Sequence, residues 1–460
     1  MEATLQEAKP LFSWRDLKKL IWPLIIEQAL AITVGLADSM MVASVGEAAV
    51  SGVSLVDMIS VLLINVFAAL ATGGAVVTSQ FIGARDLPSA RRSADQLVLV
   101  TAALSLAITA LVLICRQPML RLFFGQVEDD VMANCLTYVL ITAPSYPFIA
   151  LYNSSAAIFR AQGNSKLSMK VSLLMNAINL GGNALLIYVV GMGVAGVAIP
   201  TLVSRMVAAV VMMVLLCRKN NAVHMSPLRQ LRPDRRLIGR ILGIGIPSAL
   251  ENGMFQFGKI IVVSMITGFG TAQITANAMS NNINSLSVLM GQAMSLAIVT
   301  VVGQCVGARD LRQAKKYALR LVGVGELMLI FSCVVVMLLM PLLIRLYGAS
   351  PETASYIRQV ITLNCIAVPI FWALSFILPG ALRASNDVRF TSIVAICSMW
   401  TFRVGFSYIL GVRLGMGVVG VWTAMFLDWV VRTAFYLPRF LSGAWRKYAT
   451  FLTHPHHAEP

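Results

Sequence analysis

The stretch WPLIIEQALAITVGLADSMMVASVG, from Trp22 to Gly46, decides the fold class of this chain. It is long enough to cross a bilayer as one helix. However, it contains Pro23 and two carboxylates, Glu27 and Asp38. An acid in hydrocarbon is costly, so such a residue usually faces a protein interior or a water-filled path. At about 100° and 1.5 Å per residue, the two acids lie on one stripe of the helix, about 16 Å apart in depth.

The composition extends this reading to the whole chain. Of 460 residues, 58% are hydrophobic and only 12% are charged, whereas soluble domains carry about 25% charged residues. No β-barrel alternation appears, so the class is an all-α membrane protein. The apolar segments predict twelve transmembrane helices, at about 20–45, 54–82, 95–115, 132–159, 171–190, 193–217, 241–268, 275–306, 321–343, 359–382, 390–411 and 416–438.

The basic residues predict the orientation of these spans. The net charge is +16, but the Lys and Arg residues cluster at both ends of the chain and in alternate loops, which is the positive-inside pattern and not a nucleic-acid surface. The opposite loops hold few bases, namely Arg116, Arg121, Arg345, Arg358 and Arg413. We therefore expect a multi-pass protein of the plasma (inner) membrane, with both termini cytoplasmic, the lipid bilayer as its surroundings and no nucleic-acid partner.

An internal repeat divides the chain into two halves. Residues 83–87 (GARDL) recur as residues 307–311, an offset of 224 residues. The same offset aligns Pro23 with Pro247 and Glu27 with Glu251, and a one-residue slip aligns FRAQGNSK from Phe159 with LRASNDVR from Leu382. Two homologous six-helix lobes follow, related by a pseudo-two-fold axis along the membrane normal, with a site between them.

The repeat also predicts the domain boundaries. We expect an N-lobe at residues 1–217, a cytoplasmic linker at 218–240, a C-lobe at 241–440 and a cytoplasmic tail at 441–460. The linker is rich in basic residues and contains two prolines. We interpret its charge as an orientation determinant without a binding role.

The acids inside the spans differ in their expected roles. Asp428 precedes Arg432 by one helical turn, so we expect these two side chains to pair. Glu251 lies two turns before Lys259, which leaves it open whether Glu251 pairs with Lys259 or lines a cavity. Asp38 has no basic partner on its own helix and its counterpart in the second half is Val262, so we assign Asp38 a functional role in the N-lobe only.

Amide and aromatic side chains accompany these acids. Asn179 and Asn183 lie one turn apart and share a helix face, where they can hold a protonated aspartate or ligate an ion; hydrogen bonding between helices is the alternative. Polar residues with an aromatic neighbour around the repeated glutamates predict a substrate cavity, with the lining Glu27, Glu251, Asn252, Phe255, Gln256 and Lys259. Methionines and aromatic rings there suit varied, often cationic, ligands.

Enzyme signatures do not appear in the sequence. All four histidines lie in the linker or the tail, and the seven cysteines are scattered without a CxxC pair. No P-loop is present. We therefore expect a protein that is not an enzyme or an ATP-driven pump, with no catalytic residues, no metal site and no cofactor beyond a coupling ion. We also expect it to be a monomer.

The first helix, the two GARD motifs and the FRAQG and LRAS loops together resemble the multidrug and toxic compound extrusion (MATE) family of the MOP flippase superfamily. The resemblance covers essentially the whole chain. It implies a secondary antiporter that exports organic cations, drugs or toxic metabolites in exchange for H⁺ or Na⁺ by alternating access. It also implies first helices that bend at Pro23 and Pro247, and an N-lobe cation-coupling site made of Asp38, Asn179, Asn183 and Thr201.

Three positions depart from the pattern of the family. The family has aspartate where this chain has Asn183, which removes one negative charge from the cation site. The NorM-like branch carries acids where this chain has Phe255 and, nearby in the tenth span, Trp372. A proton-coupled mechanism in the N-lobe, in the style of the DinF-like branch, is therefore the better inference, while the branch and the choice between H⁺ and Na⁺ stay open.

Two other hypotheses compete with cation-coupled export. A flippase for a lipid-linked saccharide has the same fold, but related flippases tend to line their cavity with several basic residues, and only Arg205, Lys259, Arg403 and Arg432 lie inside the expected spans. An integral-membrane enzyme would need nucleophile, histidine or nucleotide motifs that the sequence lacks.

Overall fold

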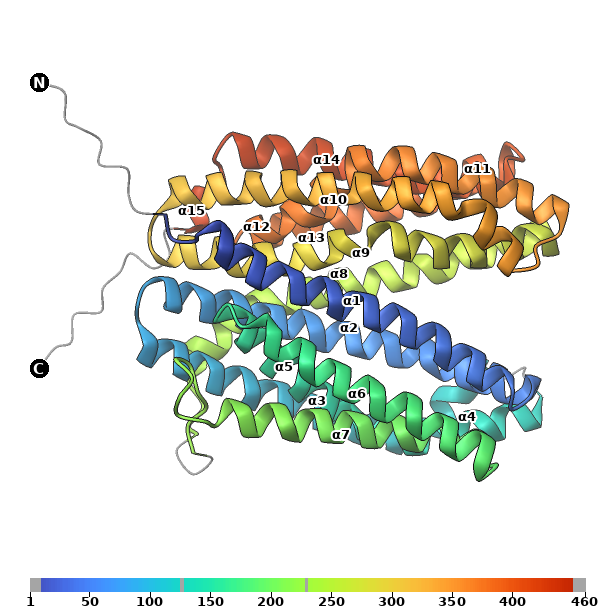
Figure 1. The fold of residues 1–460 in the computed structure, drawn as a ribbon, viewed down its shortest axis with the longest axis horizontal. Coiled ribbons are helices and arrows are strands. Elements are labelled where there is room, and N and C mark those ends of the chain that lie inside the picture. The colour runs from blue at the N-terminus through green and yellow to red at the C-terminus, as the bar shows by residue number, and fades with distance from the viewer. Residues whose placement is uncertain (1–9, 125–127, 228–230, 450–460) are drawn as a thin grey trace, which may run out of the picture.

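A computed structural model describes residues 10–124, 128–227 and 231–449 of the chain. In these residues the secondary structure is entirely helical, which confirms the all-α class. Figure 1 shows the two halves of the chain as two helical bundles that lie side by side, with both termini leaving from the same end. We call this the terminal end.

The N-lobe contains six long helical segments, two of them interrupted by a short turn of different pitch. Their bounds are α1 Trp14–Ala43, α2 Glu47–Gly83, α3 Leu87–Phe124, α4 Asp129–Thr142 with η1 Ala143–Ser145 and α5 Tyr146–Ala161, α6 Ser165–Ala184 with the π-helical η2 Leu185–Val189, and α7 Ala195–Leu216.

The C-lobe repeats this pattern. Its elements are α8 Arg235–Ile266 with η4 Thr267–Phe269, α9 Thr271–Gly307, α10 Leu311–Leu346, α11 Pro351–Ala367 with η5 Val368–Ile377 and α12 Leu378–Ala384, α13 Val388–Ser398 with η6 Met399–Gly405 and η7 Ser407–Arg413, α14 Gly417–Leu441 and α15 Arg446–Ala449. The elements η5, η6 and η7 are π-helical. Such widened turns are rare and often occur at functional sites.

All but one of the twelve spans expected from the sequence meet the length and hydropathy of a membrane-spanning helix. Among the described residues, 11 helices are long and apolar enough to cross a membrane. The helix missing from this group is α8, which at 32 residues is long enough but carries Glu251, Asn252, Gln256 and Lys259. The two-lobe arrangement of twelve helices is therefore confirmed, and the polar residues of α8 account for its lower hydropathy.

The start of α8 differs from the expected boundary. The apolar pattern placed the end of the linker at residue 240, whereas the helix begins at Arg235. The reason is an N-cap, because the Asp234 carboxylate accepts hydrogen bonds from the backbone N–H groups of Arg236 and Leu237, at 2.9 and 3.2 Å. Basic residues can therefore form the first turns of this helix before its apolar part begins.

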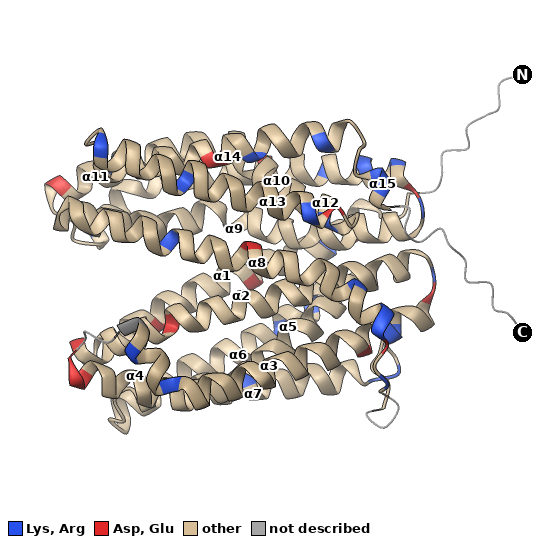
Figure 2. Cartoon of the chain, turned by 180° about the vertical axis from the view of Figure 1, so that it is seen from behind, with Lys and Arg blue, Asp and Glu red and all other residues tan. Residues whose placement is uncertain are grey.

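The lobes are joined near the terminal end by a symmetric pair of hydrogen bonds. Gln80 of α2 donates through Nε2 to the carbonyl of Ala384 at 2.8 Å, and Gln304 of α9 donates to the carbonyl of Ala161 at 2.7 Å. The two glutamines are 224 residues apart, so the repeat seen in the sequence is also a repeat of contacts. Figure 2 shows that Lys and Arg residues gather at this end, as expected for the cytoplasmic side.

Two glycines let α2 and α9 cross closely at this point. A methyl group at Gly83 would collide with the backbone carbonyl of Gln304, and one at Gly307 would collide with that of Gln80. Because backbone atoms cannot rotate away as a side chain can, only glycine fits at either position.

We predict that Gly307→Ala lowers the melting temperature of the purified protein in detergent, since overpacking of this kind costs about 1–3 kcal/mol. The matched control is Gly323→Ala on α10, where the added methyl group meets no atom within 4 Å. The control should melt at the wild-type temperature or slightly above it. Equal melting of both variants would contradict the close crossing.

Candidate functional site

The amides of α6 surround the carboxylate of Asp38. Asn183 Nδ2 donates to Asp38 Oδ1 at 2.8 Å. When the Asn179 amide is oriented so that its NH₂ group faces the acid, this group lies 3.0 Å from both carboxylate oxygens, and the amide oxygen lies 3.2 Å from the Thr201 hydroxyl. That orientation is assigned from the hydrogen-bond network. The four residues that the resemblance implied as a cation site therefore come together in the N-lobe.

Further polar residues surround this group. Asp57 of α2 accepts a hydrogen bond from Tyr138 of α4 at 3.1 Å, and Arg205 of α7 donates to the Ser145 hydroxyl at 2.8 Å. Asp57 and Arg205 both lie near enough to Asp38 to interact with it electrostatically. Arg205 follows Thr201 by one turn and so shares its helix face, a spacing from which its proximity to Asp38 could have been predicted.

The first helix continues through Pro23 without a break. Proline has no N–H, so the carbonyl one turn earlier, that of Lys19, loses its helical partner. Ser165 at the start of α6 compensates in part, because its hydroxyl donates to the Leu20 carbonyl at 2.5 Å and lies 3.4 Å from that of Lys19. The same two helices therefore meet at Pro23 and again at Asp38. Bending at Pro23 or Pro247 stays a prediction.

The repeated glutamates form the same interactions in both lobes. Glu27 lies 3.7 Å from Arg160 and accepts a hydrogen bond from Ser168 at 3.0 Å. Glu251 pairs with Arg383 at 2.6 Å, and Ser392 donates to it at 3.1 Å. The pairing of Glu251 is thus with Arg383 of α12, and the alternative pairing with Lys259 is wrong. Aligning FRAQG with LRAS had already placed the two arginines in register, a signal from which both ion pairs can be predicted.

The pairing of Asp428 with Arg432 is confirmed. Arg432 Nε donates to Asp428 Oδ1 at 2.9 Å, and both side chains are buried. Ser398 also donates to Asp428 Oδ1, at 2.6 Å. This aspartate is therefore neutralised inside the C-lobe.

A cavity of about 650 Å³ lies inside the C-lobe. Its lining comes from α8, α9, α14 and the chain from η5 through η6. The π-helical segments η5 and η6 therefore both contribute to its wall. Four of the six residues expected to line a substrate cavity are present, namely Glu251, Asn252, Phe255 and Lys259. Gln256 is not part of the lining, and Glu27 lies in the other lobe.

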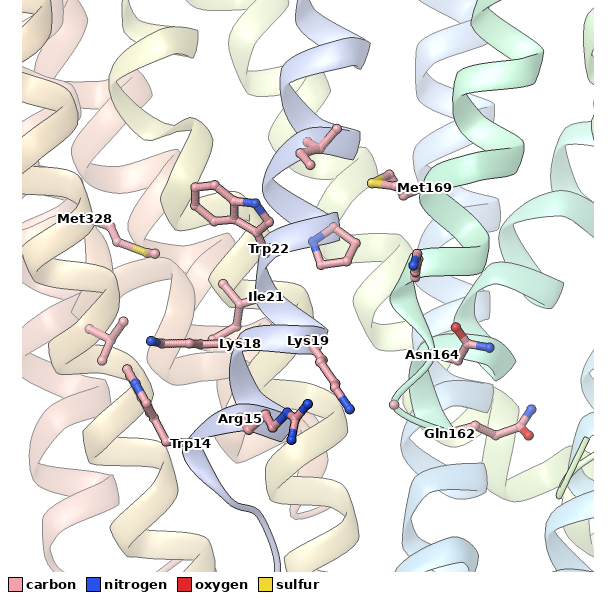
Figure 3. A pocket seen from close by; sticks show the side chains of 15 residues that line it. Trp14, Arg15, Lys18, Lys19, Ile21, Trp22, Gln162, Asn164, Met169 and Met328 are labelled. Atoms are coloured by element: carbon pink, nitrogen blue, oxygen red, sulfur yellow. The ribbon is translucent and has the colours of Figure 1, made fainter.

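A larger groove of about 950 Å³ lies near the terminal end, between α1, the α5–α6 turn and α10. Its lining holds the cations Arg15, Lys18, Lys19 and Lys166 and no acid. In Figure 3, Lys18 points toward the side of Met328 and Lys19 toward the side of Asn164. Tryptophan and lysine together at one depth are typical of the interface between membrane and water. We therefore interpret the groove as part of that interface.

Two homologous helical lobes, with charged residues held between the spans, define a membrane transporter. A model of the MatE family matches residues 23–185 and 247–409, which are segments separated by the offset of the repeat. The chain belongs to this family of transporters, in which export and not covalent chemistry is the common activity. Within the described residues, no group of three or more His, Cys, Asp or Glu side chains is arranged to hold a metal ion.

Known relatives cover nearly the full chain. The uncharacterized transporter YisQ of Bacillus subtilis is 28% identical over 441 residues, which cover 95% of this chain and 96% of YisQ. A probable multidrug resistance protein NorM of Thermotoga maritima is 25% identical, with coverage of 95% and 94%. A solved structure of a multidrug resistance MATE family transporter in an outward-facing conformation matches with a TM-score of 0.87 at 21% identity, covering 94% of this chain and 96% of that one. It confirms the fold.

We predict that Glu251→Gln lowers the melting temperature, because it leaves Arg383 without its carboxylate, and a hydrogen bond to a charged group contributes about 1.5–3 kcal/mol. Glu27→Gln should have a smaller effect, since its ion pair is longer, at 3.7 Å against 2.6 Å. Glu47→Gln, at an exposed position at the start of α2, is the matched control. If all three variants melt alike, the glutamates are not part of the shared scaffold.

Proposed function

We propose that this protein is a secondary antiporter that exports drugs or toxic metabolites from the cytoplasm in exchange for an inward-moving cation, with Asp38 as the coupling acid. Export is the function that the family membership favours. The observation that carries the coupling role is the set of Asn179, Asn183 and Thr201 around Asp38. This acid has no equivalent in the C-lobe, where Val262 stands in its place.

The mechanism follows from the hydrogen bonds of Asp38. An ionised carboxylate accepts N–H groups on both oxygens, whereas a protonated one offers fewer acceptor sites. Protonation from the outer side weakens the contact between α1 and α6. The contact of Ser165 near Pro23 joins the same two helices. When the Asp38 contact loosens, α1 can move relative to α6, and this movement changes the side of the membrane from which the substrate site is accessible. Loss of the proton to the cytoplasm restores the contact.

The amides favour H⁺ over Na⁺ as the coupling ion. They present N–H groups to Asp38, while hard cations prefer oxygen ligands. One oxygen supports Na⁺ as the alternative, since Asn183 Oδ1 is buried and has no hydrogen-bond partner among the described residues. Na⁺ coupling would require this amide to turn its oxygen toward Asp38.

We predict that Asp38→Asn abolishes gradient-driven transport, since the variant retains the side-chain shape but cannot exchange a proton. The assay uses inside-out membrane vesicles and two xanthene dyes, the cation rhodamine 6G and the anion fluorescein. Uptake is driven by an acidic lumen or, separately, by a lumen high in Na⁺. Wild-type protein should accumulate at least one dye with the pH gradient, and the variant neither.

The control for this experiment is Ser39→Ala, which changes the exposed neighbour of Asp38 on α1 and should transport as the wild type does. Full exchange by Asp38→Asn would remove this residue from the mechanism. Accumulation driven only by Na⁺ would assign the coupling ion to the alternative.

One observation favours a second candidate, a flippase for a lipid-linked saccharide. Lys259, Arg383, Arg403 and Arg432 line one cavity in the C-lobe, and a cluster of bases suits a pyrophosphate group. A deletion strain distinguishes the two functions. Increased sensitivity to dyes and drugs supports export, and a defect of the cell envelope with normal drug tolerance supports the flippase.

A further inference from the structure

We propose that the C-lobe cavity is a binding site for an aromatic organic anion, such as a carboxylate, sulfonate or phosphate on a ring system. The inference deepens the proposed function, on which its transport part rests, because it names the class of compound carried. It differs from the organic cations that the resemblance implies.

The cavity lining holds more positive than negative charges. Its acid Glu251 is neutralised by Arg383, and Asp428 behind the wall is neutralised by Arg432. Two cations of the lining then remain, Lys259 on α8 and Arg403 on η6. Among the described residues, neither side chain forms an ion pair or a hydrogen bond. The cavity as built therefore carries two uncompensated positive charges.

These two cations lie close to each other. They line the main cavity and also a smaller adjoining pocket of about 40 Å³, and they interact electrostatically. Two like charges within a membrane domain repel each other and are costly without a counter-charge. An anion placed between them removes both costs. The four-carbon stem of Lys259 allows its ammonium group to move toward such a ligand.

Hydrogen-bonding groups of the lining also lack partners. Within the part of the chain that the structure describes, Arg383 Nε, Arg403 Nε and Trp429 Nε1 are buried N–H donors with no acceptor, and Asn284 Oδ1 is a buried acceptor with no donor. Buried donors are normally satisfied. An oxyanion supplies several acceptor lone pairs, whereas an organic ammonium ion supplies only donors. Three of the four unpartnered groups therefore favour a ligand rich in acceptors.

Aromatic rings form part of the cavity wall. Trp372 stacks on Phe376 with ring centroids 5.0 Å apart, and Phe376 meets Trp429 edge-on at 6.0 Å. Arg403 lies over the Phe255 ring at 5.1 Å. Aromatic walls with a few convergent polar groups are typical of small-molecule sites. A ring system that bears an anionic group fits both parts of the cavity, and a volume of about 650 Å³ lies in the range of such sites.

Binding is tested in detergent without any gradient, by the fluorescence anisotropy of fluorescein and of rhodamine 6G titrated with purified protein. We expect wild-type protein to bind fluorescein more tightly than rhodamine 6G, with an affinity that falls as salt concentration rises. Lys259→Gln and Arg403→Gln should each weaken fluorescein binding about tenfold, the value of one charge-assisted hydrogen bond.

The matched control is Arg413→Gln, which removes an exposed arginine that follows Arg403 on the same chain segment and lies outside the cavity. It should bind both dyes as the wild type does. Because Lys259 forms no ion pair or hydrogen bond with the described residues, Lys259→Gln should also melt at or above the wild-type temperature. Tighter binding of rhodamine 6G than of fluorescein, or fluorescein binding unaffected by salt and by both variants, would overturn the proposal.

A competition experiment with a lipid identifies the source of the anion. Phosphatidylglycerol added to the micelles should compete with fluorescein only weakly if the natural ligand is a soluble aromatic anion. Strong competition that Lys259→Gln removes assigns the same anion site to a lipid head group. The anisotropy measurement needs no gradient, so a failure of Asp38-dependent transport would not change the binding result. Conversely, a failure of binding would not change the test of coupling through Asp38.

Discussion

The cost of placing a charge inside a membrane governs the arrangement of this protein. Each ionisable group within the spans needs an opposite charge, hydrogen bonds or a polar cavity. Several of them meet this requirement by pairing, as Glu27 does with Arg160, Glu251 with Arg383 and Asp428 with Arg432. Among the described groups that form no ion pair are Asp38 in one lobe and Lys259 with Arg403 in the other. We propose functions for these three residues because amides surround Asp38 and because Lys259 and Arg403 line a cavity.

The two lobes share one scaffold but differ in charge. Gene duplication accounts for the repeated glutamates, their arginine and serine partners, and the glutamines that join the lobes near the terminal end. Their interiors differ, because the N-lobe holds an acid beside amides and the C-lobe holds aromatic rings and two bases without an ion pair among the described residues. Under the proposed function the lobes divide the work, since the N-lobe responds to the coupling ion and the C-lobe binds the exported compound.

Much of the fold could be predicted from the sequence, because hydropathy and an internal repeat are local properties. The repeat also placed Arg160 and Arg383 in register with the two glutamates. The ion pairs could therefore have been predicted, although only the glutamates were singled out from the sequence. Contacts between distant helices were harder to predict. The proximity of Asp57 and Tyr138 to Asp38 depends on how α2 and α4 pack, and the basic cavity depends on two π-helical segments that no sequence pattern marked. The start of α8 was missed because an N-cap, and not hydropathy, sets it.

The central claim is that Asp38 couples ion movement to the movement of an anion bound in the other lobe. Simultaneous recording of proton flux and fluorescein flux in inside-out vesicles tests it most directly. The account predicts that fluorescein uptake by wild-type protein is accompanied by proton release from the acidic lumen. It also predicts that Asp38→Asn stops both fluxes while fluorescein still binds to the purified variant. Fluorescein uptake that continues without proton movement, in the wild type or in the variant, would contradict the account.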